Sequence, residues 1–271
     1  MIFDRKKVMQ HRNRASSNFS QAKFFAAIAK DVMNRIEPLD KNYLTVLDIN
    51  CRNGHFVRLF KKKYPMAKIL ATDISSNMLA SFEHQYKWQI DEEFILTELT
   101  KHSLSIKENY FDLINFSLGF HWINDVEKFL AQIYQLLKHD GIFIANFVGG
   151  NSLKKLRTKF INIESILNIP HSPHVSPFIS FQDIPFLLQK AGFGDIIVDQ
   201  DSTNLTYPSC YEFIKTIKGL GESNKLLNHT SHSLTKEMFS MLSICSEEFT
   251  DTINIINLIA GKAKNTIKMK A

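Results

Sequence analysis

Short apolar runs alternate with amphipathic stretches along most of this chain. The short runs are almost wholly apolar, as is typical of strands in a parallel sheet that is covered on both faces. We expect strands at residues 44–49, 69–72, 94–97, 111–116, 142–147, 196–199 and 253–260. Between the strands, apolar residues recur at helical spacing, most clearly in residues 21–35, 76–87, 125–138 and 182–191. The alternation predicts an α/β fold with a seven-stranded, mostly parallel sheet and helices on both faces.

The strongest chemical signal lies between Val46 and Gly54. This stretch runs from a buried strand into a tight loop and then into a helix that begins near His55. The next expected strand ends at Asp73, where a carboxylate can accept hydrogen bonds from both hydroxyls of a ribose. The βαβ arrangement therefore predicts a nucleoside site at the carboxyl ends of the strands.

The motif loop, residues 50–54, resembles motif I of class I S-adenosylmethionine (SAM) methyltransferases. The family usually has three alternating glycines here, whereas this chain has Asn50, Arg52 and only the last glycine, Gly54. Asn tolerates a left-handed backbone, but Arg52 has no such tolerance and places a bulky cation beside the cofactor. The resemblance implies a Rossmann-like methyltransferase sheet with SAM as the cofactor. It implies cofactor contacts at Asp48, Asn50, Cys51, Gly54, Asp73, Ile74, Thr100 and Ser117.

Three of these cofactor residues have alternatives. Asp48 could merely satisfy backbone N–H groups, although a buried carboxylate needs partners and this favours a cofactor role. Asp73 could cap the following helix, but Ser75 already offers a cap. Thr100 stands where the family usually carries an acid that contacts adenine, and Glu98 is an alternative for that contact.

The resemblance extends to one methyltransferase-like subgroup. Residues 117–125, 147–157 and 172–178 resemble three of its distinctive segments, and the similarity spans roughly residues 2–224 and, more faintly, 235–262. The subgroup contains the mitochondrial complex I assembly factor that hydroxylates an arginine, together with its alphaproteobacterial relatives. The BioC-like malonyl-carrier-protein methyltransferases of biotin synthesis are more distant relations.

Candidate catalytic and acceptor-binding residues follow the expected strands. His121 comes just after the fourth expected strand, residues 111–116, and has the chemistry of a general base. Alternatively, His121 caps its loop and the neighbouring Trp122 fills the core. A segment with three prolines, residues 169–178, is typical of a lid or recognition loop. The candidates for acceptor binding are Trp122, Arg157, His171, His174 and Tyr207. The spacing of His171 and His174 is not typical of a metal site, so we expect no metal.

Charge, hydropathy and cysteine content limit the kinds of partner and location that we expect for this protein. The net charge of +6 is diffuse and densest in the last ten residues, which favours a solvated surface over nucleic-acid binding. No apolar run is long enough to span a bilayer, so we expect no integral membrane segment. Three widely separated cysteines predict neither a disulfide framework nor a zinc site, and a reducing cytoplasm is the expected location.

The domain organisation follows from these elements. We expect an N-terminal helical segment over the cofactor site, a SAM-binding core, a lid, a return to the core, a helical cap, a last strand and a basic tail. Their predicted bounds are residues 1–40, 41–150, 151–181, 182–201, 202–252, 253–262 and 263–271. The resemblance implies that the last strand lies antiparallel at the sheet edge.

Three functions remain open. The main prediction is SAM-dependent methylation of a small acid, a carrier-bound acyl group or a protein, with a protein acceptor favoured. The alternative that the subgroup implies is hydroxylation of a protein arginine and assembly of respiratory complex I, with a complex I subunit as partner. The third is a non-catalytic relative whose altered motif loop has lost SAM binding.

Overall fold

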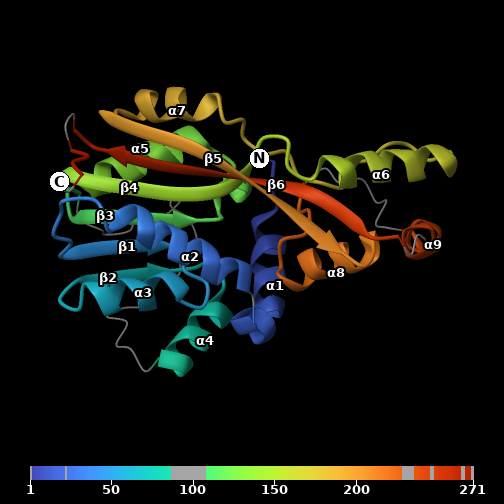
Figure 1. Cartoon of the computed structure of the whole chain (residues 1–271), viewed down its shortest axis with the longest axis horizontal. Coiled ribbons are helices and arrows are strands. Elements are labelled where there is room, and N and C mark those ends of the chain that lie inside the picture. Colours follow the sequence, from blue (N-terminus) through green and yellow to red (C-terminus); the bar gives the residue numbers. More distant parts are fainter. Residues whose placement is uncertain are drawn as a thin grey trace.

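One mixed sheet crosses the molecule with helices on both faces (Figure 1). This computed structural model describes residues 2–21, 23–86, 108–227, 235–244, 247–263 and 266–269. Within these residues the sheet has six strands in the order β2-β1-β3-β4-β6-β5. The strands are β1 (Thr45–Ile49), β2 (Lys68–Thr72), β3 (Phe111–Ser117), β4 (Leu137–Gly149), β5 (Asp195–Tyr207) and β6 (Phe249–Gly261).

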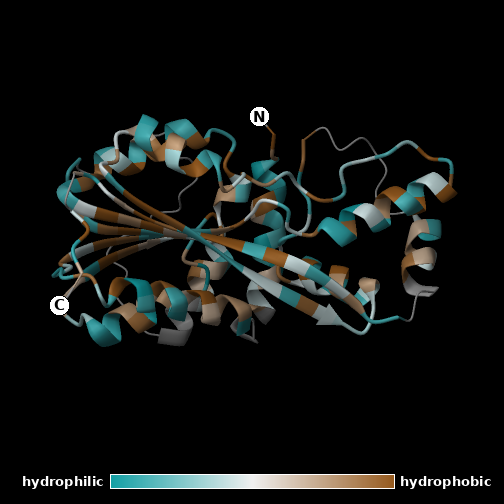
Figure 2. Cartoon of the chain, turned by 45° about the horizontal axis from the view of Figure 1, so that its top comes forward, coloured by the Kyte–Doolittle hydropathy of each residue, from teal (hydrophilic) through white to brown (hydrophobic). Residues whose placement is uncertain are grey.

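The helices form two layers on the sheet and a cluster beyond one of its ends (Figure 1). Helices α2 and α3 pack on one face and α5 and α7 on the other, each through a cluster of buried apolar side chains. Figure 2 shows the hydrophobic positions concentrated in the strands and on the inner faces of these helices. The α-helices are α1 (Arg5–Ala15), α2 (Lys23–Ile36), α3 (His55–Lys63), α4 (Ser76–Tyr86), α5 (Val126–Leu136), α6 (Lys154–Ile166), α7 (Asp183–Ala191), α8 (Cys210–Gly219) and α9 (Lys236–Ile244), and the 3-10 helices are η1 (Ser16–Gln21) and η2 (Phe120–Trp122).

The α/β class with helices on both faces of the sheet is confirmed, but the expected position of the last strand was wrong. Strands β2, β1, β3 and β4 are parallel, while β6 is antiparallel to both β4 and β5. The described sheet has six strands rather than seven, and the third expected strand (residues 94–97) lies outside the described residues. The last strand was expected at the sheet edge, yet β6 lies inside and β5 forms the edge.

The side chains of the two long strands explain this order. The second half of β6 is buried on both faces, which suits an interior strand. No residue of β5 is buried, and the strand carries Asp199, Asp201, Ser202 and Asn204, which suits an edge. Because β5 continues through Tyr207, the predicted boundary after residue 201 falls within a strand.

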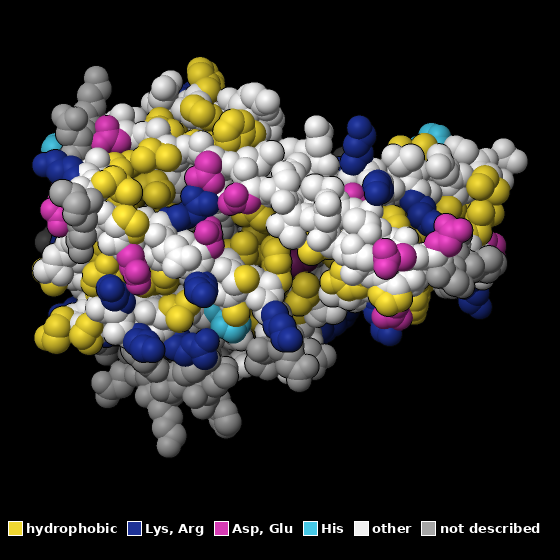
Figure 3. Space-filling view, in the orientation of Figure 1, with side chains coloured by type: hydrophobic (Ala, Val, Ile, Leu, Met, Phe, Trp, Pro, Cys, Tyr) yellow, Lys and Arg dark blue, Asp and Glu magenta, His cyan; other side chains and the backbone are white. Residues whose placement is uncertain are grey.

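The structure also bears on the expectations about surface charge, membrane spans and metal sites. On the face shown in Figure 3, lysines and arginines are interspersed with acidic side chains. Within the described part of the chain, no helix combines the length and apolarity needed to cross a membrane. Among the same residues, no group of three or more His, Cys, Asp or Glu side chains is placed to hold a metal ion.

Candidate active site

The motif loop leaves β1 through a series of left-handed residues. Asn50 has a φ of 67°, Arg52 of 52° and Gly54 of 76°. The left-handed turn expected at Asn50 is present, and Arg52 adopts the same backbone region, which its long side chain disfavours. The N–H of Cys51 donates to the carbonyl of Thr72 at 2.9 Å and so fastens the loop to the end of β2.

Asp48 lies buried at the end of β1 with one oxygen in use. Its Oδ1 accepts a hydrogen bond from Nδ2 of Asn115 at 2.6 Å, and its Oδ2 has no protein partner. Burial raises the pKa of Asp48 to about 7, against the lowering effect of the Asn115 hydrogen bond. A buried carboxylate with a free oxygen is suited to accept a proton or a hydrogen bond from a ligand.

Asp73 follows β2 and is also fully buried. Its Oδ2 accepts from the backbone N–H of Arg52 at 3.0 Å and its Oδ1 from that of Ser75 at 2.8 Å. The guanidinium of Arg12, from α1, lies 3.6 Å from the same carboxylate. The hydroxyl of Ser75 accepts the N–H of Met78 and caps α4, so the helix cap does not depend on Asp73.

Glu222 is the central residue of the site, and the sequence analysis did not predict it. Its Oε2 accepts from Nε1 of Trp122 at 2.9 Å and lies 3.1 Å from Nε2 of His121. Its Oε1 lies 2.7 Å from a guanidinium nitrogen of Arg52 and 3.8 Å from one of Arg12. The similarity to the subgroup extends through residue 222, but no local pattern marks this acid, because its partners lie 100 and more residues away.

The ionisation states follow from this arrangement. Burial opposes the charge of Glu222, but Arg52, the His121 hydrogen bond and Arg12 hold its pKa well below the ordinary value. Burial lowers the pKa of Arg52 to about 10, with Glu222 opposing that change, so Arg52 stays charged at neutral pH. Burial also lowers the pKa of His121, so the imidazole is neutral and its Nε2–H donates to Glu222. Nδ1 of His121 has no partner and is the nitrogen that can accept a proton.

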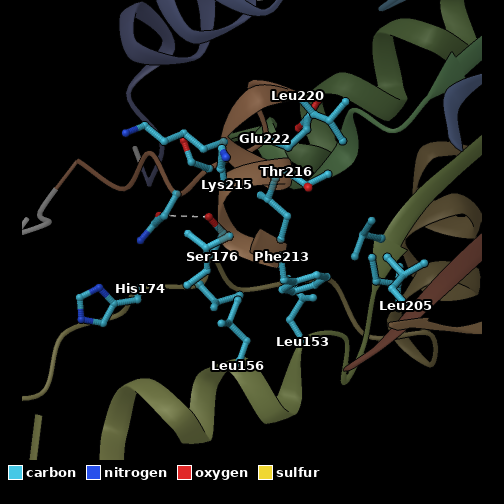
Figure 4. Close-up of a pocket in the computed structure, with 18 of the residues that line it drawn as sticks. Leu153, Leu156, His174, Ser176, Leu205, Phe213, Lys215, Thr216, Leu220 and Glu222 are labelled. Carbon is cyan, nitrogen blue, oxygen red and sulfur yellow. Dashed lines mark hydrogen bonds between the residues drawn. The ribbon is translucent and has the colours of Figure 1, made fainter. Parts of the chain in front are cut away.

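A large apolar cavity lies beside His121 and Glu222. Its volume is about 580 Å³, and α6, α8, β5 and the Pro-rich loop supply most of its wall (Figure 4). In Figure 4, Leu153 and Leu156 lie at the bottom of the view with Phe213 above them, while Leu220 and Glu222 lie at the top. We refer to this cavity as the acceptor pocket. Trp122, His174 and Tyr207, three of the predicted acceptor-binding residues, line it.

The two other predicted acceptor residues have different positions. Arg157 donates to the carbonyls of Val175 and Ser176 at 3.0 and 2.7 Å, so it holds the Pro-rich loop from below. Neither it nor His171 lines the pocket, and the His171 side chain is 58% exposed.

A buried acid fixes the same loop. Glu164 of α6 lies 2.8 Å from Nε2 of His174 and 3.2 Å from Nδ1 of His171, and it also accepts the N–H of Ser172. The His174 ring stacks on Phe160. The histidine pair is therefore tied to Glu164, and the Pro-rich loop is a fixed wall of the acceptor pocket.

Among the residues that the structure describes, the chemistry around the motif loop fits SAM, but the cavity there is too small for it. Unpartnered polar atoms of Asp48, Asn53 and His55 lie around a cavity of about 30 Å³. Small-molecule sites usually need roughly 300–1,000 Å³. Cys51 and Ser117 also line this cavity, Ile74 packs instead beside Trp122, and Thr100 lies outside the described residues.

The parallel strands, the acids at the ends of β1 and β2 and the left-handed loop define a Rossmann-like nucleoside-binding enzyme fold. Residues 47–145 match the family described as a methyltransferase domain. The YcgJ protein from Bacillus subtilis shares this fold, with a TM-score of 0.55 and 17% identity over 88% of this chain and 100% of that one.

Sequence relatives then establish the family. A protein of Rickettsia prowazekii that carries a methyltransferase name is 42% identical over 86% of this chain and 99% of its own length. The chain therefore belongs to the class I SAM-dependent methyltransferases, whose cofactor is SAM. The human mitochondrial arginine-hydroxylase NDUFAF5 is 32% identical over 82% of this chain, which spans 64% of the human protein. A malonyl-[acyl-carrier protein] O-methyltransferase of Ilyobacter polytropus is 24% identical over 99% of this chain and 97% of its own length.

Proposed function

We propose that this protein methylates an acceptor group that is attached to a larger molecule through an apolar chain. This apolar chain binds in the acceptor pocket. The observation that carries the proposal is the acceptor pocket of about 580 Å³, whose wall is mainly Leu, Ile and Phe side chains. Such a wall suits an acyl chain on a carrier protein or a long side chain of a protein substrate. The name of the Ilyobacter relative supports the first of these acceptors.

The charges at the two ends of the pocket disfavour a small free acid. Glu222 at the inner end is ionised and repels a carboxylate, so an acid needs the additional contacts of a carrier to bind there. Arg157, one of the predicted acceptor-binding residues, is engaged with loop carbonyls and does not offer its charge to a free acid. The exposed Lys215 and Lys218 line the pocket from α8 and suit an acidic carrier surface.

Hydroxylation of a protein arginine is the second candidate function. The NDUFAF5 relative supports it by name, and the inner end of the acceptor pocket supports it by geometry. There the Arg52 guanidinium binds Glu222 at 2.7 Å and lies 4.2 Å from the centre of the Phe25 ring. A carboxylate beside an aromatic face is a general recognition site for a guanidinium.

Methyl-labelled SAM and three classes of acceptor test the proposal. We expect label on an acyl-carrier protein that bears a dicarboxylic acyl group, and none on the same acid in free form. An arginine-containing peptide, supplied with dioxygen and a two-electron reductant, tests the second candidate: one added oxygen atom without a methyl group, detected by mass spectrometry, would establish hydroxylation. Labelling of the free acid alone would contradict both functions.

A matched pair of variants on α6 tests the role of the pocket. Leu156→Trp fills the cavity and should raise KM for the acceptor by about tenfold, about 1.4 kcal/mol. Ile161→Trp places the same side chain at a position that is 49% exposed and should leave KM unchanged. Equal effects of the two variants would show that the acceptor binds elsewhere. The cytoplasmic location and the absence of nucleic-acid partners stay predictions.

A further inference from the structure

Aromatic side chains fill the space above the motif loop that a nucleoside would need. Phe19 of η1 and Phe25 of α2 are buried with their ring centres 4.4 Å apart. The Arg52 guanidinium lies 4.2 Å from the Phe25 ring centre and 5.7 Å from that of Phe19. Both rings line the cavity of about 30 Å³, so they and Arg52 account for its small size.

The polar groups suited to a nucleoside are divided into two sets. The first set already has protein partners: Asp73 accepts two backbone N–H groups and faces Arg12, and Asn50 accepts a hydrogen bond from Arg12. The second set, Asp48 Oδ2 and both side-chain atoms of Asn53, is buried without partners. Native proteins seldom leave buried polar atoms unpaired, so this set indicates a ligand that the closed cavity does not admit.

An ion network holds the N-terminal segment in this position. Arg12 from α1 and Arg52 from the motif loop share the carboxylate of Glu222, which follows α8. Gly221 makes the approach of that segment to α1 possible, since it has a φ of +76° and a Cβ there would lie 3.0 Å from the carbonyl oxygen of His11. The network thus joins the N-terminal segment, the motif loop and the helical cap that contains Glu222.

We infer that residues 12–21 and 23–25 form a gate over the SAM site and that SAM binds only after Phe19, Phe25 and the Arg12–Asp73 pair move away from the motif loop. The inference builds on the SAM dependence of the proposed function but not on the acceptor. Glu222 lies at the boundary of both sites, because it pairs with the two arginines and also lines the acceptor pocket. The same carboxylate therefore links the gate to the acceptor pocket.

Stopped-flow fluorescence with SAM alone tests the gate. The indole of Trp122 donates to Glu222 and reports on the network, and Trp88→Phe removes the second of the two tryptophans. In that background the observed binding rate should level off at high SAM concentration, because opening then limits the rate. A rate that rises linearly up to the highest concentration would overturn the gate.

A pair of phenylalanine variants locates the gate. Phe19→Ala opens space above the motif loop and should raise the SAM association rate by about tenfold. Phe186→Ala is the control, because Phe186 lies on α7, is 65% exposed and lines neither cavity, and its association rate should match that of the parent. Normal SAM binding with equal rates in all three proteins would overturn the gate alone. Failure of the parent and of Phe19→Ala to bind SAM would overturn both the gate and the proposed function.

Discussion

The motif-loop cavity and the acceptor pocket lie on either side of Glu222, and they differ in volume, polarity and packing. The first encloses about 30 Å³ among buried acids, amides and a guanidinium, and the second about 580 Å³ among apolar side chains. The acceptor pocket is open because its wall is fixed by Glu164 and Arg157. The motif-loop cavity is closed because oppositely charged side chains bind one another across it. A site lined by complementary charges can close on itself, whereas an apolar wall held by contacts behind it cannot.

Removal of the shared carboxylate should give the largest effect. Glu222→Gln leaves the charges of Arg12 and Arg52 buried with less compensation and should lower the free energy of unfolding by about 3–5 kcal/mol. Urea unfolding measures this change. Glu212→Gln on α8 is the control, because that carboxylate is 44% exposed and pairs with an exposed lysine, so the loss should stay below about 1 kcal/mol. Similar losses in the two variants would show that the network adds nothing to stability.

Asp48, the buried acid of the motif-loop cavity, should make the free energy of unfolding depend on pH. Burial raises the pKa of Asp48 from 3.8 to about 7, so between these values the folded protein keeps a proton that the unfolded chain releases. Asp48 therefore makes stability fall as pH rises from about 4 to about 7, by at most about 4 kcal/mol. Asp48→Asn should remove this fall and be more stable than the parent at pH 8 but not at pH 4. Parallel stability–pH curves would contradict the assignment.

The acid at the end of β2 should affect SAM affinity. Asp73→Ala removes two charge-assisted acceptors for the ribose and should weaken SAM binding by about 2–4 kcal/mol in isothermal titration. Asp140→Ala, whose side chain is 75% exposed on β4, should leave the affinity unchanged. Unchanged affinity in Asp73→Ala would mean that the open site holds the ribose through other groups.

Substitutions in the Pro-rich loop, the fixed wall of the acceptor pocket, should have the smallest effect on stability. His174→Ala leaves the buried Glu164 with fewer partners and should cost about 1–3 kcal/mol of stability and raise the acceptor KM. His171→Ala should change both less, because that side chain is largely exposed. SAM affinity should stay within about threefold of the parent in both variants. A larger loss of SAM affinity would mean that the loop also supports the cofactor site.

Local patterns were enough to predict much of the cofactor edge. The apolar run before Asp48 and the run before Asp73 specify two adjacent parallel strands, and this pairing is present. The left-handed turn at Asn50 also follows from the residue itself, since Asn tolerates that backbone. The sequence places the Arg52 cation beside the cofactor but does not indicate which group it binds. The structure shows it paired with Glu222 and stacked on Phe25.

The sequence alone determined the α/β class, the family and the two acids at the strand ends, because these depend on hydrophobic period and on residues close together in the chain. The tertiary structure decided the interior position of β6, the role of Glu222 and the closure by Phe19 and Phe25. Arg52 and Glu222 are 170 residues apart, and no local pattern records which charge a buried guanidinium will meet. Desolvation requires that each buried charge find a partner, but only packing determines which partner is near.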